Sequence, residues 1–268
     1  MALMTARRIL DQQYFGPRAW YRDVAAMISL ITVLPSRALV PQHRSLRAMP
    51  IAGAVASILS ACLFALSLNI GLPVTISATL SIACLVMTGG GLHEDGLADT
   101  ADGFGGGGTQ TEKLEIMRDS VIGSFGTIAI VLSLLARILL LVEIARLIAP
   151  ITCMAVLIAV GALSRTGIIA VLASLPSARP DGLGAAYARP SHSVLIQAFS
   201  VGGILSLALL ATPGGMSVLL AAWIGMGLAT FSIARLAMRQ IGGQTGDVCG
   251  AVQQGSEIFI LIFILAAT

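Results

Sequence analysis

Long apolar stretches, separated by short polar, glycine- or proline-containing stretches, make up most of this chain. Several are close to the ~20 residues that an α-helix needs to cross the hydrocarbon core of a bilayer. Proline, glycine or charged residues bound each stretch and mark the expected helix ends. We expect seven membrane-spanning helices, at residues 51–70, 74–88, 121–147, 151–175, 194–211, 216–236 and 248–267.

Two shorter helices are expected beside these spans. Residues 24–34 are apolar but stop at Pro35, too early to cross a bilayer, so they should form an interfacial or re-entrant helix. Residues 109–120 are polar and should form a short interfacial helix. Charges interrupt residues 1–21, so no cleavable signal peptide is expected there. The predicted fold class is all-α, a single polytopic helical membrane domain over residues 1–268.

The composition agrees with a membrane protein. Hydrophobic residues make up 56% of the chain, charged residues 11%, and the mean hydropathy is +0.92, far above an ordinary soluble domain. The net charge of +3 would suit nucleic acid, but the basic residues are scattered and aromatics make up only 5%, so no nucleic-acid partner is expected. The four cysteines have no paired spacing and are expected to be small buried hydrophobic residues.

Loop charges predict the topology, because positive residues near span ends collect on the cytoplasmic side. The basic loop residues that fall on one side, together with the N-terminal arm, are Lys113, Arg118, Arg179, Arg189, Arg235 and Arg239. The opposite turns, at residues 71–73, 149–150 and 212–215, carry no charge. Every polar motif is therefore expected to face the cytoplasm.

An acidic, glycine-rich segment lies at residues 89–108, between the second and third expected spans. Its ionisable residues are His93, Glu94, Asp95, Asp99 and Asp102. In a helix the three aspartates fall at i, i+4 and i+7 and share one face. Their mutual repulsion implies a divalent metal ion or a basic partner.

Magnesium is the expected metal, with manganese as the alternative, because the ligands are hard oxygens and no cysteine is near. Magnesium is usually shared between protein carboxylates and phosphates, so the substrate should be a phosphoanhydride or phosphodiester. Gly105 and Gly106 are candidate substrate-binding residues, since glycine lets backbone amides approach phosphate. A solvated acidic loop would explain the glycines alone, but three aspartates at helical spacing beside a membrane favour the metal.

Ionisable residues inside spans are costly and usually functional. Arg165 lies toward the cytoplasmic end of its span, where it either clamps a phosphate or snorkels to the interface. Arg137 and Glu143 lie deeper or toward the far side and are expected to be structural pairing groups.

Three other sites are ambiguous by residue type alone. Arg179 and Asp181 lie among turn-forming residues, as in an ordinary connecting loop. Asp247 directly precedes the last span and either caps that helix or adds a ligand to the metal. His93, next to the acids, is a candidate base, metal ligand or simple hydrogen-bond partner.

These motifs resemble the signature of the cobalamin 5′-phosphate synthase family. The matching stretches are residues 90–103, residues 116–120 with Gly123, Ser164-Arg165, residues 178–184, and residues 243–250 with Thr245-Gly246-Asp247. The resemblance therefore follows the chain in order over nearly its whole length. Glu94 departs from the leucine of many family members.

The resemblance implies a magnesium-dependent transferase in the bacterial inner membrane, with its active site facing the cytoplasm. Such an enzyme joins α-ribazole or its 5′-phosphate to adenosylcobinamide-GDP, releases GMP and completes the nucleotide loop of cobalamin. Its partners would be these substrates and membrane lipid, and a homo-oligomer stays open. The candidate residues are Asp95, Asp99, Asp102 and Asp247 for the metal, His93, Glu94 and Arg165 for catalysis, and Arg118, Arg179, Asp181, Gly105, Gly106 and Thr245 for substrate binding.

Three other functions differ in their expected motifs. A CDP-alcohol phosphotransferase has an Asp-Gly pair followed by Ala-Arg, whereas Asp95-Gly96 is followed here by Ala98-Asp99. A prenyltransferase needs a DDxxD run, which this sequence lacks. A transporter would place acids at the bilayer midplane within broken helices, whereas we expect them in a loop after the second span.

Overall fold

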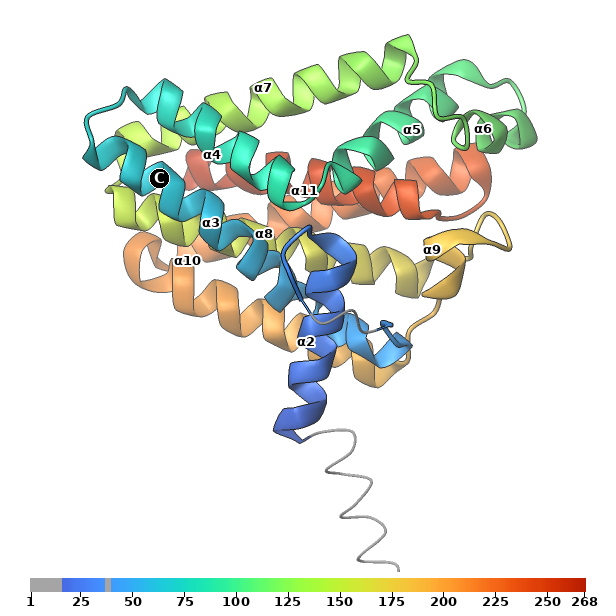
Figure 1. Cartoon of the computed structure of the whole chain (residues 1–268), viewed down its shortest axis with the longest axis horizontal. Helices are drawn as coiled ribbons and strands as arrows, with labels where there is room; N and C mark the ends of the chain where they lie inside the picture. Colours follow the sequence, from blue (N-terminus) through green and yellow to red (C-terminus); the bar gives the residue numbers. More distant parts are fainter. Residues whose placement is uncertain (1–15, 37–39) are drawn as a thin grey trace, which may run out of the picture.

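The computed structural model describes the chain except residues 1–15 and 37–39 and the side chains of residues 212–214. Most of the basic N-terminal arm lies outside the described residues. Every regular element in the described part is helical, which confirms the predicted fold class (Figure 1). In chain order the helices are α2 (Pro17–Ile31), the 3₁₀ helix η1 (His43–Ala48), α3 (Met49–Asn69), α4 (Val74–Thr88), α5 (Leu92–Gly106), α6 (Gln110–Ile116), α7 (Ser124–Leu147), α8 (Pro150–Ser174), α9 (Gly182–Ala186), α10 (His192–Ile241) and α11 (Gly246–Ala267).

Six helical stretches of the described chain are long and apolar enough to cross a membrane. They are His43–Asn69, Ser124–Leu147, Pro150–Ser174, His192–Ala211, Gly215–Ile241 and Gly246–Ala267. α10 contains two of them because it breaks at Gly215, whose φ of 74° is a conformation that glycine adopts without strain. The predicted separation of the fifth and sixth spans is confirmed at this break.

α4 and α5 form a seventh candidate span, and here the prediction was wrong in detail. α4 has 15 residues and is roughly 22 Å long, short of the ~30 Å bilayer core. After a bend of 87°, α5 continues the path, and only the pair is long enough to cross. Gly90 and Gly91, with φ of 61° and 71°, make the bend. The acidic segment is therefore a helix in a bent pair with α4, of the kind found in broken spans and re-entrant segments, and not a loop after a complete span.

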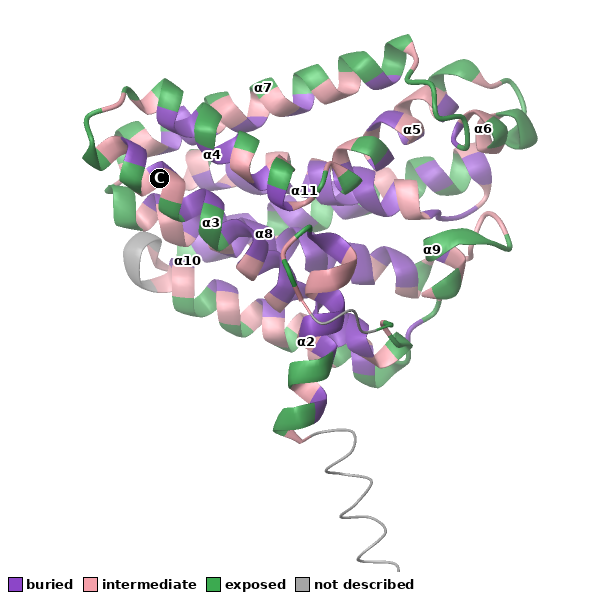
Figure 2. Ribbon diagram, in the orientation of Figure 1, coloured by how far each residue is buried: buried purple, intermediate pink, exposed green. Residues whose placement is uncertain are grey.

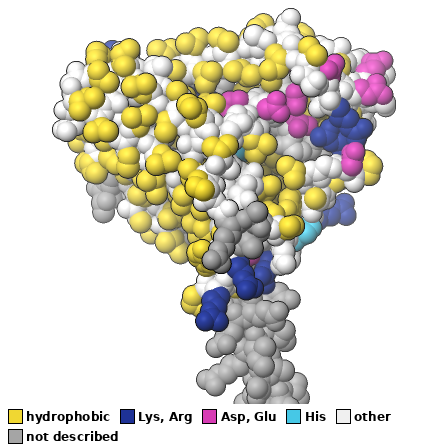
Figure 3. Space-filling model, in the orientation of Figure 1, with side chains coloured by type: hydrophobic (Ala, Val, Ile, Leu, Met, Phe, Trp, Pro, Cys, Tyr) yellow, Lys and Arg dark blue, Asp and Glu magenta, His cyan; other side chains and the backbone are white. Residues whose placement is uncertain are grey.

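The polar connections gather at one end of the molecule, as predicted. α6, α9 and the α10–α11 loop lie together there in Figure 1, and Figure 3 shows acidic and basic side chains at the same end. The backbone N–H of Ala178 donates to the carbonyl of Gln244 at 2.9 Å, and Lys113 hydrogen-bonds Gln240. The α10 break and the C-terminus lie at the opposite end. Which side of a membrane the polar end faces stays a prediction.

α8 forms the centre of the helix bundle. It contacts α3, α10 and α11, and Figure 2 shows buried residues concentrated along it while the outward faces of the surrounding helices are exposed. Large apolar side chains such as Leu132 and Phe231 remain on these outer faces, 60% and 65% exposed. So much exposed apolar surface is expected where helices contact lipid.

Glycine allows α5 and α11 to approach each other closely beside the acidic segment. A Cβ atom placed on Gly96 would lie 2.9 Å from the carbonyl oxygen of Asp247 and 3.2 Å from the Cα of Gly250. The obstructing atoms are backbone, so they cannot rotate away as a side chain can. This contact places the first turn of α11 directly against the acidic helix.

Replacing Gly96 by alanine should push the two helices apart. We expect Gly96→Ala to lower the free energy of unfolding by about 1–3 kcal/mol, as overpacking does, measured by thermal unfolding in detergent. Gly227→Ala is the matched control, because Gly227 is helical and exposed and a Cβ there meets nothing within 4 Å. Alanine favours a helix over glycine, so the control should be neutral or slightly stabilising. Equal losses in both variants would contradict the close contact.

Candidate active site

The three aspartates of the acidic segment lie on the helix α5 and not in the expected loop, so the condition for their i, i+4 and i+7 spacing to share one face is met. Asp99 is half-buried and lies within electrostatic range of three other carboxylates, those of Asp95, Asp102 and Asp247. Arg179 is the cation within the same range. Four acids, three from α5 and one from α11, therefore converge on one region, although sequence spacing could relate only the first three.

Asp102 has a structural contact that the sequence did not predict. Its two carboxylate oxygens accept the backbone N–H groups of Gly123 at 2.8 Å and Gly126 at 2.9 Å, at the start of α7. These are the unpaired donors of a helix N-terminus, where a negative charge is favoured. Asp102 thus ties the end of α5 to α7, whereas no comparable contact holds Asp95 or Asp99 in the described structure.

Asp247 faces the acids on α5 and does not cap its own helix. Thr245 is the N-cap of α11, because its hydroxyl oxygen accepts the N–H of Val248 at 3.2 Å and donates to Asp247 Oδ2 at 3.1 Å. The same Oδ2 accepts a hydrogen bond from Arg179 Nη2 at 3.1 Å. The capping alternative for Asp247 is therefore wrong, and its carboxylate remains at the site.

The arrangement of the acids bears on the predicted metal. Among the described residues, no three His, Cys, Asp or Glu side chains are placed closely enough to hold a metal ion. The donor chemistry nevertheless fits magnesium, since the converging groups are carboxylates and magnesium commonly takes only one or two of them, with phosphate oxygens and water completing its shell. Asp95 and Asp99 are the residues with free oxygens for such a site.

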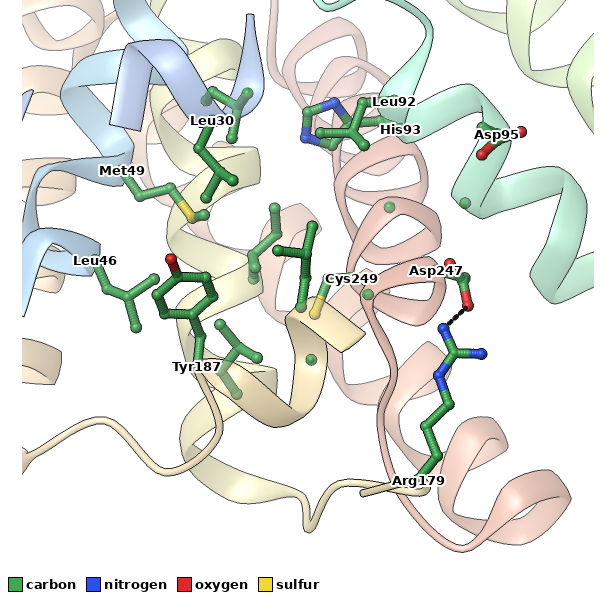
Figure 4. A pocket seen from close by; sticks show the side chains of 18 residues that line it. Leu30, Leu46, Met49, Leu92, His93, Asp95, Arg179, Tyr187, Asp247 and Cys249 are labelled. Carbon is green, nitrogen blue, oxygen red and sulfur yellow. Dashed lines mark hydrogen bonds and ion pairs between the residues drawn. The ribbon is translucent and has the colours of Figure 1, made fainter. Parts of the chain in front are cut away.

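A cavity of about 230 Å³ opens beside Asp95, Asp247 and Arg179 (Figure 4). Helices α2, α3, α5, α8 and α11 and the short η1 and α9 contribute its wall. Tyr187, at the end of α9, also lines it and donates its hydroxyl to the carbonyl of Pro41 at 3.1 Å. Burial raises the pKa of the Tyr187 phenol, so it stays protonated at neutral pH. The cavity therefore joins charged groups to a largely apolar interior.

Buried ionic side chains link the start of α5 to the bundle. Arg137 of α7, 1% exposed, binds Glu94 at 3.1 Å and Glu257 of α11 at 3.0 Å. Arg165 of α8, 3% exposed, binds the other oxygen of Glu257 at 2.8 Å. Gln254 donates to Glu94 at 2.8 Å. The structure thus confirms Arg137 as a pairing group. In this network two carboxylates are paired with two guanidinium groups.

This network changes the expectations for Glu94 and Arg165. Both point into the network, so Arg165 does not snorkel to the surface. Neither lines the 230 Å³ cavity, and a phosphate contact by Arg165 stays a prediction. Glu143 pairs instead with Arg146 on the exposed side of α7.

The remaining predicted substrate-binding residues do not line the cavity, and these are Arg118, Asp181, Gly105, Gly106 and Thr245. Arg118 Nη2 binds Asp181 Oδ1 at 2.6 Å, and both side chains are exposed at the polar end. Gly105 packs under Phe125, and Gly106 lies near Ile116, in the last turn of α5. Contacts of these residues with substrate stay predictions.

Sequence reasoning missed two sets of residues. Glu257 was overlooked although it is an acid inside an apolar span, four residues after Gln253, with which it hydrogen-bonds. A second buried pair, Asp23 and Arg47, joins α2 to η1 at 2.7 Å, with the Arg47 guanidinium over the Trp20 ring. The apolar cavity wall gave no sequence signal, because its residues are of the same types as the rest of the core.

A family model described as cobalamin-5-phosphate synthase matches residues 23–265 of the chain. That match covers the acidic helix, the network and the cavity together. The chain belongs to this family. Its relatives include proteins named adenosylcobinamide-GDP ribazoletransferase, and no solved structure matches the chain significantly.

Three of these relatives come from rhizobial bacteria. The protein of Azorhizobium caulinodans is 45% identical over 219 residues, 81% of this chain and 82% of the relative. That of Bradyrhizobium diazoefficiens is 43% identical over 251 residues, 91% of this chain and 93% of the relative. That of Mesorhizobium japonicum is 41% identical, over 92% of this chain and 94% of the relative. The family signature predicted from the motifs is thus confirmed over most of the chain.

Replacing Arg137 should show how much its ion pairs contribute to the stability of the protein. Arg137→Met leaves the partly buried Glu94 without a cation and the buried Glu257 with Arg165 alone, so we expect a loss of about 3–5 kcal/mol in unfolding free energy, measured by thermal unfolding in detergent. Arg146→Met is the matched control on the same helix, because its pair with Glu143 is more than half exposed and should be worth less than about 1 kcal/mol. Similar losses in the two variants would show that the network is not energetically coupled.

Proposed function

We propose that this protein is an adenosylcobinamide-GDP ribazoletransferase, which joins α-ribazole or its 5′-phosphate to adenosylcobinamide-GDP and releases GMP. The observation that carries this proposal is the cavity lined by Asp95, Asp247 and Arg179, with Asp99 within electrostatic range of all three, in a chain of the cobalamin-5-phosphate synthase family. Acids and a guanidinium at one mouth suit a diphosphate bound through a cation. The whole chain is proposed to act as one transferase domain.

Asp95, Asp99 and Asp247 are the residues proposed to hold magnesium, or manganese, while Asp102 fixes the helix that carries the first two. Magnesium bound there would neutralise the charge that builds on the diphosphate as GMP leaves. Carboxylates that repel one another in the free protein become favourable ligands once a divalent cation lies between them. The repulsion around Asp99 thereby supports a cation at this position.

Arg179 is proposed to bind the diphosphate. In the structure its guanidinium is held by Asp247 at 3.1 Å, which keeps it extended toward the cavity mouth. A phosphate group offers a guanidinium the same bidentate geometry as a carboxylate, so a bound diphosphate would replace Asp247 as the partner of Arg179 and leave that carboxylate free to hold magnesium. This exchange couples substrate binding to assembly of the metal site.

The reaction transfers the phosphoryl group on the cobinamide side of the diphosphate. A ribazole oxygen attacks that phosphorus in line, a new P–O bond forms, and the bond to the bridging oxygen breaks so that GMP leaves with it. The acceptor is a ribose hydroxyl in both α-ribazole and its 5′-phosphate, because attack by the 5′-phosphate would form a second P–O–P anhydride in place of a phosphodiester. For a hydroxyl acceptor, His93 is the proposed proton acceptor, because it lines the cavity, whereas Glu94 is engaged with Arg137 and Gln254.

The location of the reaction follows from the helices and the loop charges. The spans make this a multi-pass membrane protein, and the basic loops at the polar end support a cytoplasmic site in the inner membrane of a bacterium. Both substrates would then reach the mouth from the cytoplasm. Transporters also place acidic residues in broken helices, so the bend between α4 and α5 does not argue against transport. The family match is the observation that supports the transferase over a transporter.

Asp99 offers the sharpest test of the proposed metal site. Asp99→Asn should reduce GMP release from adenosylcobinamide-GDP and α-ribazole by roughly 10²–10³-fold, the loss typical of a group that stabilises transition-state charge. Removing one repelling charge should leave the protein folded, with an unchanged or higher unfolding temperature. Product formation in detergent, followed by mass spectrometry with and without magnesium, measures the effect.

Glu143→Gln serves as the control for this substitution. It makes the same carboxylate-to-amide change on an exposed face far from the cavity and should retain wild-type turnover. Near-normal GMP release by Asp99→Asn, or wild-type turnover after complete removal of divalent cations, would refute the metal site. Cation flux in proteoliposomes without any nucleotide turnover would refute the transferase.

A further inference from the structure

The cavity beside the acids has two chemically different sides. Asp95, Asp247 and Arg179 form the charged side, and Figure 4 shows the apolar side chains gathered opposite the Asp247–Arg179 pair. The apolar side consists of Leu30, Ile31, Leu46, Met49, Ile168 and Leu172. A ligand that fills this cavity must therefore combine a charged or polar end with an apolar body.

Polar groups of His93 and Arg179 give a further indication that a ligand enters the cavity. The His93 side chain is buried, 5% exposed, and lines the wall, yet its ring nitrogens have no hydrogen-bond partner among the described residues. Figure 4 shows the ring pointing toward the apolar side near Leu30, while Asp95 leaves α5 on the side of Asp247 and Arg179. Arg179 lines the same cavity, and its Nη1 is buried without a hydrogen-bond partner among the described residues. Buried polar groups are nearly always paired, so this guanidinium nitrogen indicates a polar atom supplied by a ligand.

We propose that this cavity binds the ribazole, with its bicyclic aromatic base against the apolar side and its ribose at His93. The reacting oxygen of the ribazole then faces Asp95 and Arg179. This inference rests on the proposed function, which supplies the ribazole as a substrate. It adds that Ile168, Leu172, Leu46 and Met49 select the base.

Size and polarity distinguish the ribazole base from the other groups that the reaction brings to the site. A corrin ring is far too large for about 230 Å³, since even drug-sized ligands fill ~300–1,000 Å³. Guanine is small enough, but its edge carries several donors and acceptors that the apolar side would leave unpaired. The base of the ribazole is a planar, mostly hydrocarbon bicycle, about the size of a tryptophan side chain. It is therefore the one of the three that an apolar wall favours.

Ile168 is the position at which this inference can be tested. It lies on α8, the central helix, is 3% exposed and borders the cavity, so the size of its side chain sets the available space. Ile168→Phe should fill the cavity, and Ile168→Ala should enlarge it. The neighbouring Ile169 is also isoleucine, fully buried and absent from the cavity wall, which makes Ile169→Ala the matched control for loss of core volume.

The first experiment measures binding of α-ribazole to the purified protein in detergent by isothermal titration calorimetry, without the second substrate. We expect at least a tenfold rise in Kd for Ile168→Phe and a wild-type Kd for Ile169→Ala. Failure of the wild-type protein to bind α-ribazole, or an equal Kd in Ile168→Phe, would overturn the inference. An equal Kd is also the result expected if a lipid chain occupies the cavity.

The second experiment measures selectivity during turnover. With Ile168→Ala we expect kcat/KM to shift at least tenfold toward a ribazole with an enlarged tricyclic base, while the KM for adenosylcobinamide-GDP stays unchanged. A change confined to the KM of adenosylcobinamide-GDP would assign the cavity to guanine and overturn the inference. The two proposals can be refuted independently. If ribazole binding depends on Ile168 but no GMP is released, only the proposed reaction is refuted. If GMP is released but base selectivity is unchanged in Ile168→Ala, only this inference is refuted.

Discussion

The rest of the site depends on one network of four charged side chains, Arg137, Arg165, Glu94 and Glu257, within the helix bundle. Arg137 binds both Glu94 and Glu257, and Arg165 binds Glu257, inside an apolar bundle, where an unpaired charge is very costly. The pairs connect α5, α7, α8 and α11, so they fix the position of the first turn of α5. The bend at Gly90 and Gly91 is thereby held in one geometry, and the acidic face that follows has a defined direction.

The acidic face is held from both ends of α5. Glu94 ties its start to α7 and α11, and Asp102 ties its end to the backbone at the start of α7. Asp99 lies between these anchors with no hydrogen-bond partner among the described residues. Because both ends of α5 are fixed, the helix cannot move its carboxylates away from the other acids. Their mutual repulsion therefore persists and makes binding of a cation favourable.

The close approach of α5 and α11 connects this charge to the cavity. Because Gly96 and Gly250 have no side chains, the backbone of Asp247 lies against α5, and its carboxylate meets both Arg179 and the acids. A small cavity of about 10 Å³ borders His93 and the buried network together. The network therefore also positions the wall on which His93 lies, and the charged and apolar parts of the site form one continuous structure.

The sequence alone determined the helical membrane fold, the helical spacing of the acids and the family, because span length, i, i+4 spacing and ordered motifs are local properties of the chain. It did not determine that Asp247 faces Asp99, that Thr245 and not Asp247 caps α11, or that Glu94 belongs with Arg137. These depend on which helices are neighbours and how closely they pack, and residues 120 or more positions apart, such as Arg137 and Glu257, carry no mutual signal. The apolar cavity was decided only by the tertiary structure, since Ile168 at its wall and Ile169 in the core are the same residue type.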